Sequence, residues 1–211
     1  MTVKVQWPDG TYSLPRTVQG CPTGWSTGWR YQDNEDNNNA NYWQPSNLNS
    51  YMNFDLGTDY RTYYCTKTFS GSMSGSTWPR GRYCIARYGG SCPTGFAGGY
   101  IYWDDEDRNN ANSLQGPIPD GDYGRNTRVQ YCCRNDGNPS QGVRLPTTKA
   151  FVLYQFGPTC QVVMGMNYPV QLMVHFDDED SNNENSCSGS HPNGSCGRNN
   201  EIYFCYYSPA N

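Results

Sequence analysis

The chain contains the acidic sequence Tyr102-Trp103-Asp104-Asp105-Glu106-Asp107-Arg108-Asn109-Asn110-Ala111-Asn112 in three versions. The other two are Tyr31-Gln32-Asp33-Asn34-Glu35-Asp36-Asn37-Asn38-Asn39-Ala40-Asn41 and His175-Phe176-Asp177-Asp178-Glu179-Asp180-Ser181-Asn182-Asn183-Glu184-Asn185. Their first aspartates lie 71 and 73 residues apart, a period long enough for a four-stranded unit. The period predicts one domain over residues 1–211, made of three repeats at about 7–69, 78–134 and 145–207.

Short β-strands are predicted on both sides of each acidic segment. Aromatic and β-branched residues run into the segments at 28–31, 99–102 and 170–175, and they suit a pleated, half-buried surface. No stretch has a convincing helical period, and three or four strands per repeat would total about 9 to 12. We therefore expect an all-β, pseudo-threefold domain resembling a β-prism and stapled by disulfides, with a β-trefoil or a β-sandwich as alternatives.

Charge and hydropathy argue against a nucleic-acid partner and against a transmembrane helix. The net charge is -4, from 15 Lys and Arg against 19 Asp and Glu, so the chain offers no basic field for a phosphate backbone. No apolar run is long enough for a transmembrane helix. Of the 19 carboxylates, 11 lie at 33–36, 104–107 and 177–180 within the three acidic segments, which therefore require cations, hydrogen-bond donors or open water.

Ten cysteines without a C-x-x-C pair indicate a secreted, extracellular protein rather than a zinc protein. Residues 1–5 show no apolar signal-peptide core, so the sequence does not say whether one was removed. Each repeat closes on a predicted strand, at 57–65, 124–132 and 197–205. One cysteine precedes each acidic segment and one lies in each of these closing strands, which predicts a bridge within each repeat. The predicted pairs are Cys21 with Cys65, Cys92 with Cys132, Cys160 with Cys205, Cys84 with Cys133, and Cys187 with Cys196.

Repeated oxygen donors at short spacing are what a Ca²⁺ site needs, because the ion takes about 6–8 oxygen ligands. Calcium is the one cofactor that the sequence suggests. The alternative is that the same side chains hydrogen-bond backbone amides in turns and hold no metal. The candidate calcium ligands are Asp33, Glu35, Asp36, Asp104, Glu106, Asp107, Asp177, Glu179 and Asp180.

A glycosidase would use two such carboxylates as acid and as nucleophile or base. Three similar acidic segments instead suit three structural or binding sites, because one catalytic centre usually combines different groups. The two histidines, His175 and His191, form no readable triad with a serine. We predict that the protein is not an enzyme and has no catalytic residues, and a glycosidase is the weaker alternative.

Several ordered motifs resemble the apextrin C-terminal (ApeC) domain family over nearly the whole chain. They include residues 7–15 (Trp-Pro-Asp-Gly-Thr-Tyr-Ser-Leu-Pro), 28–33 (Gly-Trp-Arg-Tyr-Gln-Asp), 92–96 (Cys-Pro-Thr-Gly-Phe), 103–107, 120–127, 131–134 and 203–207. Apextrin-like proteins are secreted or cell-surface proteins linked to innate immunity. The resemblance implies a lectin-like pattern-recognition protein that binds bacterial cell-wall material such as peptidoglycan fragments and muramyl dipeptide.

The residues themselves give independent support for glycan binding. The 31 aromatic side chains exceed what a core of this size needs, and exposed rings would stack on sugars. A guanidinium binds a carboxylate through two hydrogen bonds, so arginines are suited to sialic acid, a muramyl carboxylate or another N-acetylated sugar. The candidate ligand-binding residues are Arg125, Asn126, Arg198 and Asn199. Alternatively, these arginines neutralise their own acidic segments. The second function class is an adhesive or structural matrix protein. The sequence does not identify the glycan. It also does not fix the oligomeric state, and it is compatible with an oligomer.

Overall fold

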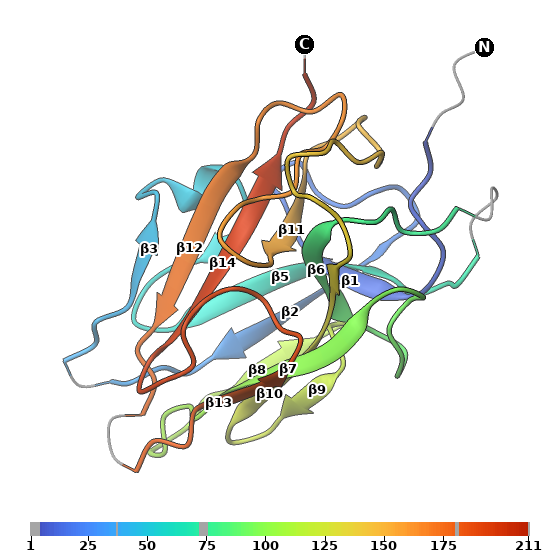
Figure 1. Cartoon of the computed structure of the whole chain (residues 1–211). Helices are drawn as coiled ribbons and strands as arrows, with labels where there is room; N and C mark the ends of the chain where they lie inside the picture. The colour runs from blue at the N-terminus through green and yellow to red at the C-terminus, as the bar shows by residue number, and fades with distance from the viewer. Residues whose placement is uncertain (1–4, 37, 72–75, 180–181, 211) are drawn as a thin grey trace.

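The computed structural model describes residues 5–36, 38–71, 76–179 and 182–210 (Figure 1). Apart from one 3-10 turn, η1 (Leu48–Ser50), the regular elements in these ranges are strands. They are β1 (Tyr12–Pro15), β2 (Ser26–Gln32), β3 (Tyr42–Gln44), β4 (Phe54–Asp55), β5 (Tyr60–Lys67), β6 (Arg82–Arg87), β7 (Ala97–Trp103), β8 (Ser113–Gln115), β9 (Gly121–Tyr123), β10 (Thr127–Asn135), β11 (Phe151–Gln155), β12 (Val170–Phe176), β13 (Ser186–Gly189) and β14 (Asn200–Tyr207). The all-β prediction is confirmed.

All the strands belong to one strongly curled antiparallel sheet (Figure 1). The pairing runs along three strips, which are β1-β5-β2-β8 (strip one), β6-β10-β7-β13 (strip two) and β11-β14-β12-β3 (strip three). Strand β6 also pairs with β1 and with β11, and so joins the strips. The outer strand of each strip follows the acidic segment of another repeat. Each strip is therefore completed by a different part of the chain.

This topology differs from the predicted β-prism. A β-prism has three separate sheets, whereas these strips continue into one another through β6. The pseudo-threefold domain is therefore not confirmed at the level of the sheet. The described strands also do not divide into the two packed sheets of a β-sandwich.

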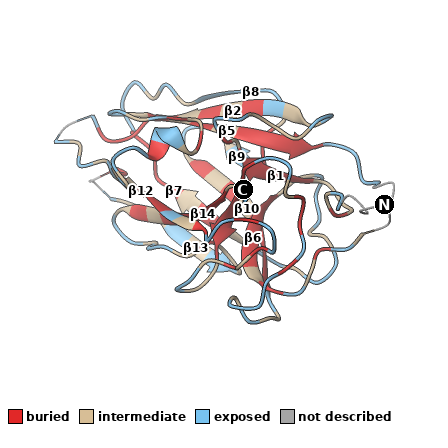
Figure 2. Cartoon of the chain, turned by 90° about the horizontal axis from the view of Figure 1, so that it is seen from above, coloured by how far each residue is buried: buried red, intermediate tan, exposed pale blue. Residues whose placement is uncertain are grey.

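The closing strands β5, β10 and β14 show why the core forms where it does. Each alternates buried and half-buried residues at first, and its next four residues are buried without interruption (Figure 2). Alternation marks a strand with one face on the core, and a continuous run marks a strand that is covered on both faces. Core rings such as Trp103, Tyr131 and Tyr154 pack among these strands on the inner side of the curl.

The five predicted disulfides are all present, and no cysteine is free in the described ranges. The bridges are Cys21–Cys65, Cys84–Cys133, Cys92–Cys132, Cys160–Cys205 and Cys187–Cys196. Four of them close loops of 40 to 49 residues and anchor a closing strand. By restricting the unfolded chain, each stabilises the fold by about 2–4 kcal/mol.

Candidate functional site

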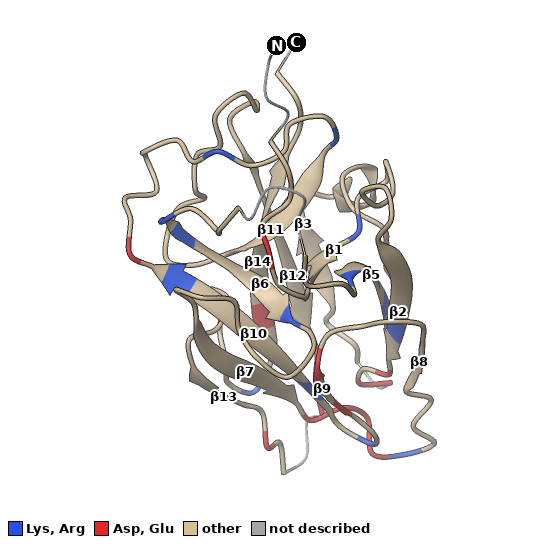
Figure 3. Ribbon diagram, turned by 90° about the vertical axis from the view of Figure 1, so that its right-hand side faces the viewer, with Lys and Arg blue, Asp and Glu red and all other residues tan. Residues whose placement is uncertain are grey.

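The three acidic segments meet at the end of the molecule away from the two termini (Figure 3). Their backbones form a closed circle of hydrogen bonds, in which each glutamate N–H donates to an aspartate carbonyl of another segment. The bonds run from Glu35 to Asp177 (3.0 Å), from Glu106 to Asp33 (3.1 Å) and from Glu179 to Asp104 (3.0 Å). Residues far apart in the chain are thereby fixed together. We call this arrangement the acidic ring.

Side chains repeat the same links between the segments. The carboxylates of Asp33, Asp104 and Asp177 accept the N–H groups of Ala111 (2.7 Å), Glu184 (2.8 Å) and Ala40 (2.6 Å). In return, the amide oxygens of Asn112, Asn185 and Asn41 accept the N–H groups of those three aspartates at 2.7–2.8 Å.

The backbone of the acidic segments is alike as well. Asn38, Asn109 and Asn182 have φ of 56°, 55° and 57°, the left-handed conformation that asparagine tolerates better than most residues. The three segments thus share the same left-handed turn at the matching asparagine. Asn37, Asp180 and Ser181 lie outside the described residues.

Three glutamates converge in the acidic ring. Side-chain oxygens of Glu35, Glu106 and Glu179 lie within 4.8 Å of one another, and all three residues are buried. The N–H groups of Asp36 and Asp107 donate to the Glu106 and Glu179 carboxylates, each at 3.2 Å. A buried set of carboxylate oxygens is the donor chemistry that suits a hard cation such as Ca²⁺.

The other candidate calcium ligands are placed differently. The carboxylates of Asp33, Asp104 and Asp177 accept a backbone N–H, as those of Glu106 and Glu179 do, but they do not belong to the compact group of glutamate oxygens. Asp36 and Asp107 are exposed, and the Asp107 carboxylate forms an ion pair with Arg125. Asp180 lies outside the described residues. Only the three glutamates of the predicted set therefore form a compact group among those described.

Sequence reasoning missed the fully buried residue directly after the first aspartate of each segment, which is Asn34, Asp105 or Asp178. Burial raises the pKa of Asp105 to about 7, although hydrogen bonds from Thr127, Asn112 and Gln32 and the charge of Arg30 partly offset it. The pKa of Asp178 is also raised, by burial and by the nearby Asp105. The interior behind the acidic ring thus favours protonated carboxyls.

A second carboxyl pair lies at the ring itself. Burial raises the pKa of Asp33 to about 6, and the adjacent Asp59 adds to the rise. Asp59 also accepts the N–H of Asn34 at 3.1 Å. Beside the second and third segments, Asn126 and Asn199 occupy the place that Asp59 holds beside the first. Their amides donate to Asp104 (2.7 Å) and Asp177 (2.9 Å).

The four predicted ligand-binding residues are not brought into one site. Arg125 is exposed and pairs with Asp107, as the neutralising alternative expected. The Arg198 carbonyl accepts the side-chain amides of Asn183 and Asn185 at 3.0 and 2.9 Å. Asn126 and Asn199 point toward the acidic ring. The four residues therefore support the second and third acidic segments and lie in two different strips.

Two outer faces of the sheet carry a guanidinium over aromatic rings. On strip one, Arg61 lies 4.6 Å from the Trp29 ring centroid and 5.5 Å from that of Tyr31. On strip two, Arg128 lies 4.7 Å from Tyr100 and 5.8 Å from Tyr102. We call these the two cationic faces. A sequence signal existed, because Arg61 and Arg128 each follow two residues after Asp59 or Asn126.

The matching face of strip three has the opposite charge. Glu201 stands where the other strips have arginine, and it accepts the Tyr42 hydroxyl at 2.9 Å. His175 stacks on Tyr42 with centroids 4.4 Å apart, and its Nδ1 lies 3.2 Å from Glu201. His175 is therefore a residue of β12 within a polar cluster.

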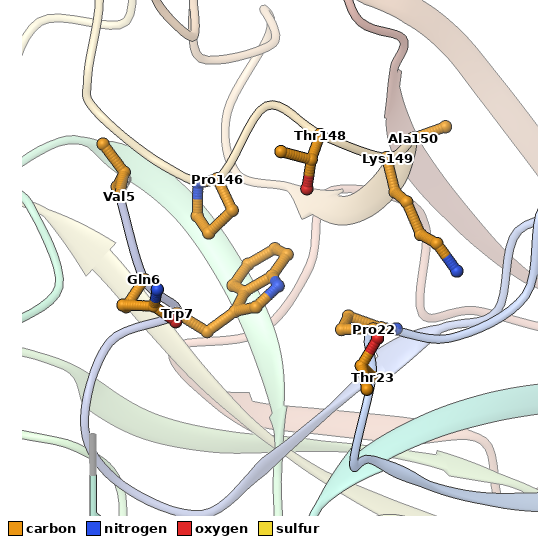
Figure 4. Close-up of a pocket in the computed structure, with 9 residues that line it drawn as sticks. All are labelled: Val5, Gln6, Trp7, Pro22, Thr23, Pro146, Thr148, Lys149 and Ala150. Carbon is orange, nitrogen blue, oxygen red and sulfur yellow. The ribbon is translucent and has the colours of Figure 1, made fainter. Parts of the chain in front are cut away.

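A cavity of 320 Å³ lies near the N-terminal part of the chain, with the Trp7 indole in the middle of its lining residues (Figure 4). Trp7 packs on Trp25 at 5.3 Å and edge-on against Phe151 at 5.2 Å. The Lys149 amine donates to the Cys21 carbonyl at 3.3 Å. The ring and the cation that line this cavity are thus engaged by other parts of the protein.

The chain matches the family described as the C-terminal domain of apextrin (ApeC) over residues 7–207. It therefore belongs to this family, as the resemblance implied. No curated protein and no solved structure gives a significant match to the chain. No helix among the described residues is long and apolar enough to cross a membrane. The family and the disulfides indicate an extracellular protein of apextrin type.

Proposed function

We propose that the protein is a lectin-like pattern-recognition protein that binds bacterial cell-wall or sialylated glycans. The two cationic faces carry this proposal. Half-buried Trp29 and Tyr100 offer flat apolar rings for sugar stacking, and Arg61 and Arg128 beside them offer donors for hydroxyl and carboxylate oxygens. The arginines are held in place, because Asp55 lies 3.6 Å from Arg61 and Asp122 lies 3.4 Å from Arg128.

Two such faces on one small domain favour polymeric targets. A polymer that engages both faces gains avidity without tight binding at either one. A bacterial cell wall, with peptidoglycan fragments and muramyl dipeptide as its small representatives, presents sugars in this repeated form. This supports cell-wall glycans as the ligand class.

Glycan-array binding tests the proposal. Wild-type protein is expected to bind a subset of glycans and to be displaced by free monosaccharide. Tyr100→Ala is expected to weaken binding about three- to tenfold, since an aromatic contact contributes about 0.5–1.5 kcal/mol. Tyr168→Ala, at a tyrosine with 79 % exposure outside both faces, is the matched control and should bind as wild type. Binding to protein partners alone would instead support the adhesive function.

We also propose that Ca²⁺ binds the three glutamates of the acidic ring and holds the segments together. Added Ca²⁺ should raise the melting temperature and a chelator should lower it. At a concentration 100 times Kd, the expected rise is about 5–10 °C for a domain of this size. The measurement is thermal unfolding followed by circular dichroism, with and without the ion.

Two variants make the calcium test specific. Glu106→Gln should abolish the response to Ca²⁺, because it removes one of the three carboxylates that would bind the ion. Glu184→Gln, at an exposed glutamate of the third segment, should keep the full response. A wild-type melting temperature that ignores both Ca²⁺ and chelator would refute the metal site.

A further inference from the structure

We propose that a cleft beside Arg16 and Trp29 binds a pyranose that carries one carboxylate. This inference rests on the proposed glycan binding and adds the place where an acidic sugar of that class binds. The cleft has a volume of 260 Å³, lies at the end of the strip-one cationic face, and is lined by Arg16, Trp29, Tyr63 and Gln115 with the backbone near Gly28 and Gly116. That volume is below the range typical of drug-sized ligands, about 300–1,000 Å³, and suits a single sugar ring.

Among the residues that the structure describes, the Arg16 guanidinium beside this cleft has no counter-ion, and a comparison within the chain makes this clear. Arg16 and Arg87 hold matching places, each nine residues after the Trp-Pro pair begins at Trp7 or Trp78. Their carbonyls accept matching N–H groups, from Asn53 at 2.8 Å and from Asp120 at 2.7 Å. The two arginines thus have the same backbone setting.

Their side chains differ in one respect. The Arg87 Nε lies 3.0 Å from the Asp120 carboxylate, and the two form an ion pair. Asn53 stands in the place of that aspartate beside Arg16. The Arg16 Nε and the Asn53 Oδ1 are both buried without a hydrogen-bond partner in the described part of the chain. Within the same ranges, no carboxylate lies within ion-pair distance of Arg16.

The third repeat shows a neutral version of the same place. There the Gln155 carbonyl accepts the N–H of Asn193 at 2.7 Å, so neither residue of the pair is charged. The chain therefore contains a compensated cation, an uncharged pair and, at Arg16, a cation left uncompensated beside a cleft. A carboxylate on the ligand would supply the missing counter-ion.

The walls of the cleft are fixed before any ligand arrives. The Trp29 indole N–H donates to Gln115 at 3.0 Å, and the Tyr63 hydroxyl donates to Asp55 at 2.8 Å. Two glycines let the backbones approach closely, since a Cβ on Gly28 would lie 2.3 Å from the Pro117 carbonyl oxygen. Gly116 has φ of +72°, and a Cβ there would lie 2.5 Å from the Thr27 oxygen. Such a preformed wall lowers the entropy cost of binding.

The chemistry of the lining defines the ligand. A guanidinium matches a carboxylate with two parallel hydrogen bonds, and an indole face packs on the C–H face of a pyranose. The Tyr63 and Gln115 side chains can exchange hydrogen bonds with ring hydroxyls. Glucuronic acid and glucose form a matched pair of probes, because they differ only by the carboxylate.

The test is titration of the full chain with each sugar, followed by NMR chemical shifts. Wild type is expected to bind glucuronic acid about tenfold more tightly than glucose, because one charge-assisted contact separates them. Asn53→Asp should recreate the ion pair of Arg87 with Asp120, remove this preference and leave glucose binding unchanged. The variant should fold, since it adds a counter-ion to an uncompensated cation.

Asn193→Asp is the control, because it makes the same charge change at the matching place of the third repeat. It should keep the wild-type preference for glucuronic acid. Equal binding of the two sugars by wild type, or an Asn53→Asp protein that still prefers glucuronic acid, would overturn this site. Glycan-array binding by the same wild-type sample would then show that the general proposal stands. Absence of binding to the array and to both sugars would overturn both.

Discussion

Replacing Asn112 with alanine is expected to lower the free energy of unfolding by about 2–4 kcal/mol, because several hydrogen bonds inside the acidic ring lose a partner at once. The Asn112 amide oxygen accepts the N–H of Asp33 at 2.8 Å. Its NH₂ group donates to the buried Asp105 carboxyl at 2.7 Å and to the Arg125 carbonyl at 2.9 Å. Urea unfolding of wild type and variant measures the difference.

Related asparagines provide a graded series. Asn185 makes the matching bonds, to Asp104 and to the buried Asp178, so Asn185→Ala should cost about as much. Asn41→Ala should cost less, since the corresponding buried position holds a neutral amide in place of a carboxyl. Asn138→Ala is the control. Asn138 is exposed, and its side chain accepts only the N–H of Ser140 among the described residues.

The contrast between Asn112 and Asn138 decides whether the acidic ring is a stabilising element. Equal and small losses at both positions would contradict the ring's role and would leave the disulfides as the main constraint on the segments. A large loss at Asn112 alone would show that contacts between the segments hold this end of the molecule together.

Three of the five disulfides could be predicted because their cysteines lie at fixed places within a repeated pattern. Cys21, Cys92 and Cys160 precede an acidic segment, and Cys65, Cys132 and Cys205 lie in closing strands, so pairing within a repeat was the simplest solution. The all-β class followed equally from the short alternating segments. Both features depend on residues that belong to one repeat.

The sheet edges and the acidic ring could not be predicted in this way. Strand β8 pairs with β2, and β13 with β7, across the boundaries of the repeats. These strands have three and four residues, and their own sequences do not indicate which strand they pair with. The pairing of such a short strand is determined by its neighbours in the folded protein. The convergence of the three glutamates depends on the same crossings.

The sequence contains a pattern that marks the arginines of the cationic faces, but a different pattern led the ligand prediction to other arginines. Arg125 and Arg198 stood beside repeated asparagines and drew the ligand prediction. Arg61 and Arg128 lie on alternating strands, where one residue in two faces outward, and their aromatic partners come from another strand. Their pairing with Trp29 and Tyr100 therefore requires the register, which sequence patterns do not give.

The free energy of unfolding is expected to fall as pH rises from about 4 to about 7, by as much as about 1.4 kcal/mol per pH unit for each carboxyl that titrates in this window. Burial raises the pKa of Asp105 to about 7, and it also raises the pKa of Asp178. Between the ordinary and the raised pKa, the folded state holds a proton that the unfolded state has released. Deprotonation therefore favours the unfolded state as pH increases.

The opposite limb lies at lower pH. A hydrogen bond from Arg134 lowers the pKa of Asp136 to about 2, so the stability that this pair contributes is lost as pH falls from about 4 toward 2. The two trends together place maximum stability near pH 4 to 5. Urea unfolding at intervals between pH 3 and pH 7.5, in the presence of chelator, would trace both limbs.

Asp105→Asn assigns the upper limb to a named group. The amide of Asn34 occupies the matching buried position in the first segment, so an amide fits there. The variant should resemble wild type near pH 4.5, where Asp105 is protonated, and should become the more stable protein near pH 7.5, with a shallower slope between. Asp122→Asn, at an exposed carboxylate on β9, should keep the wild-type slope. A stability that rises between pH 5 and pH 7 would mean that the interior behind the acidic ring stabilises ionised carboxylates, contrary to the effect of burial.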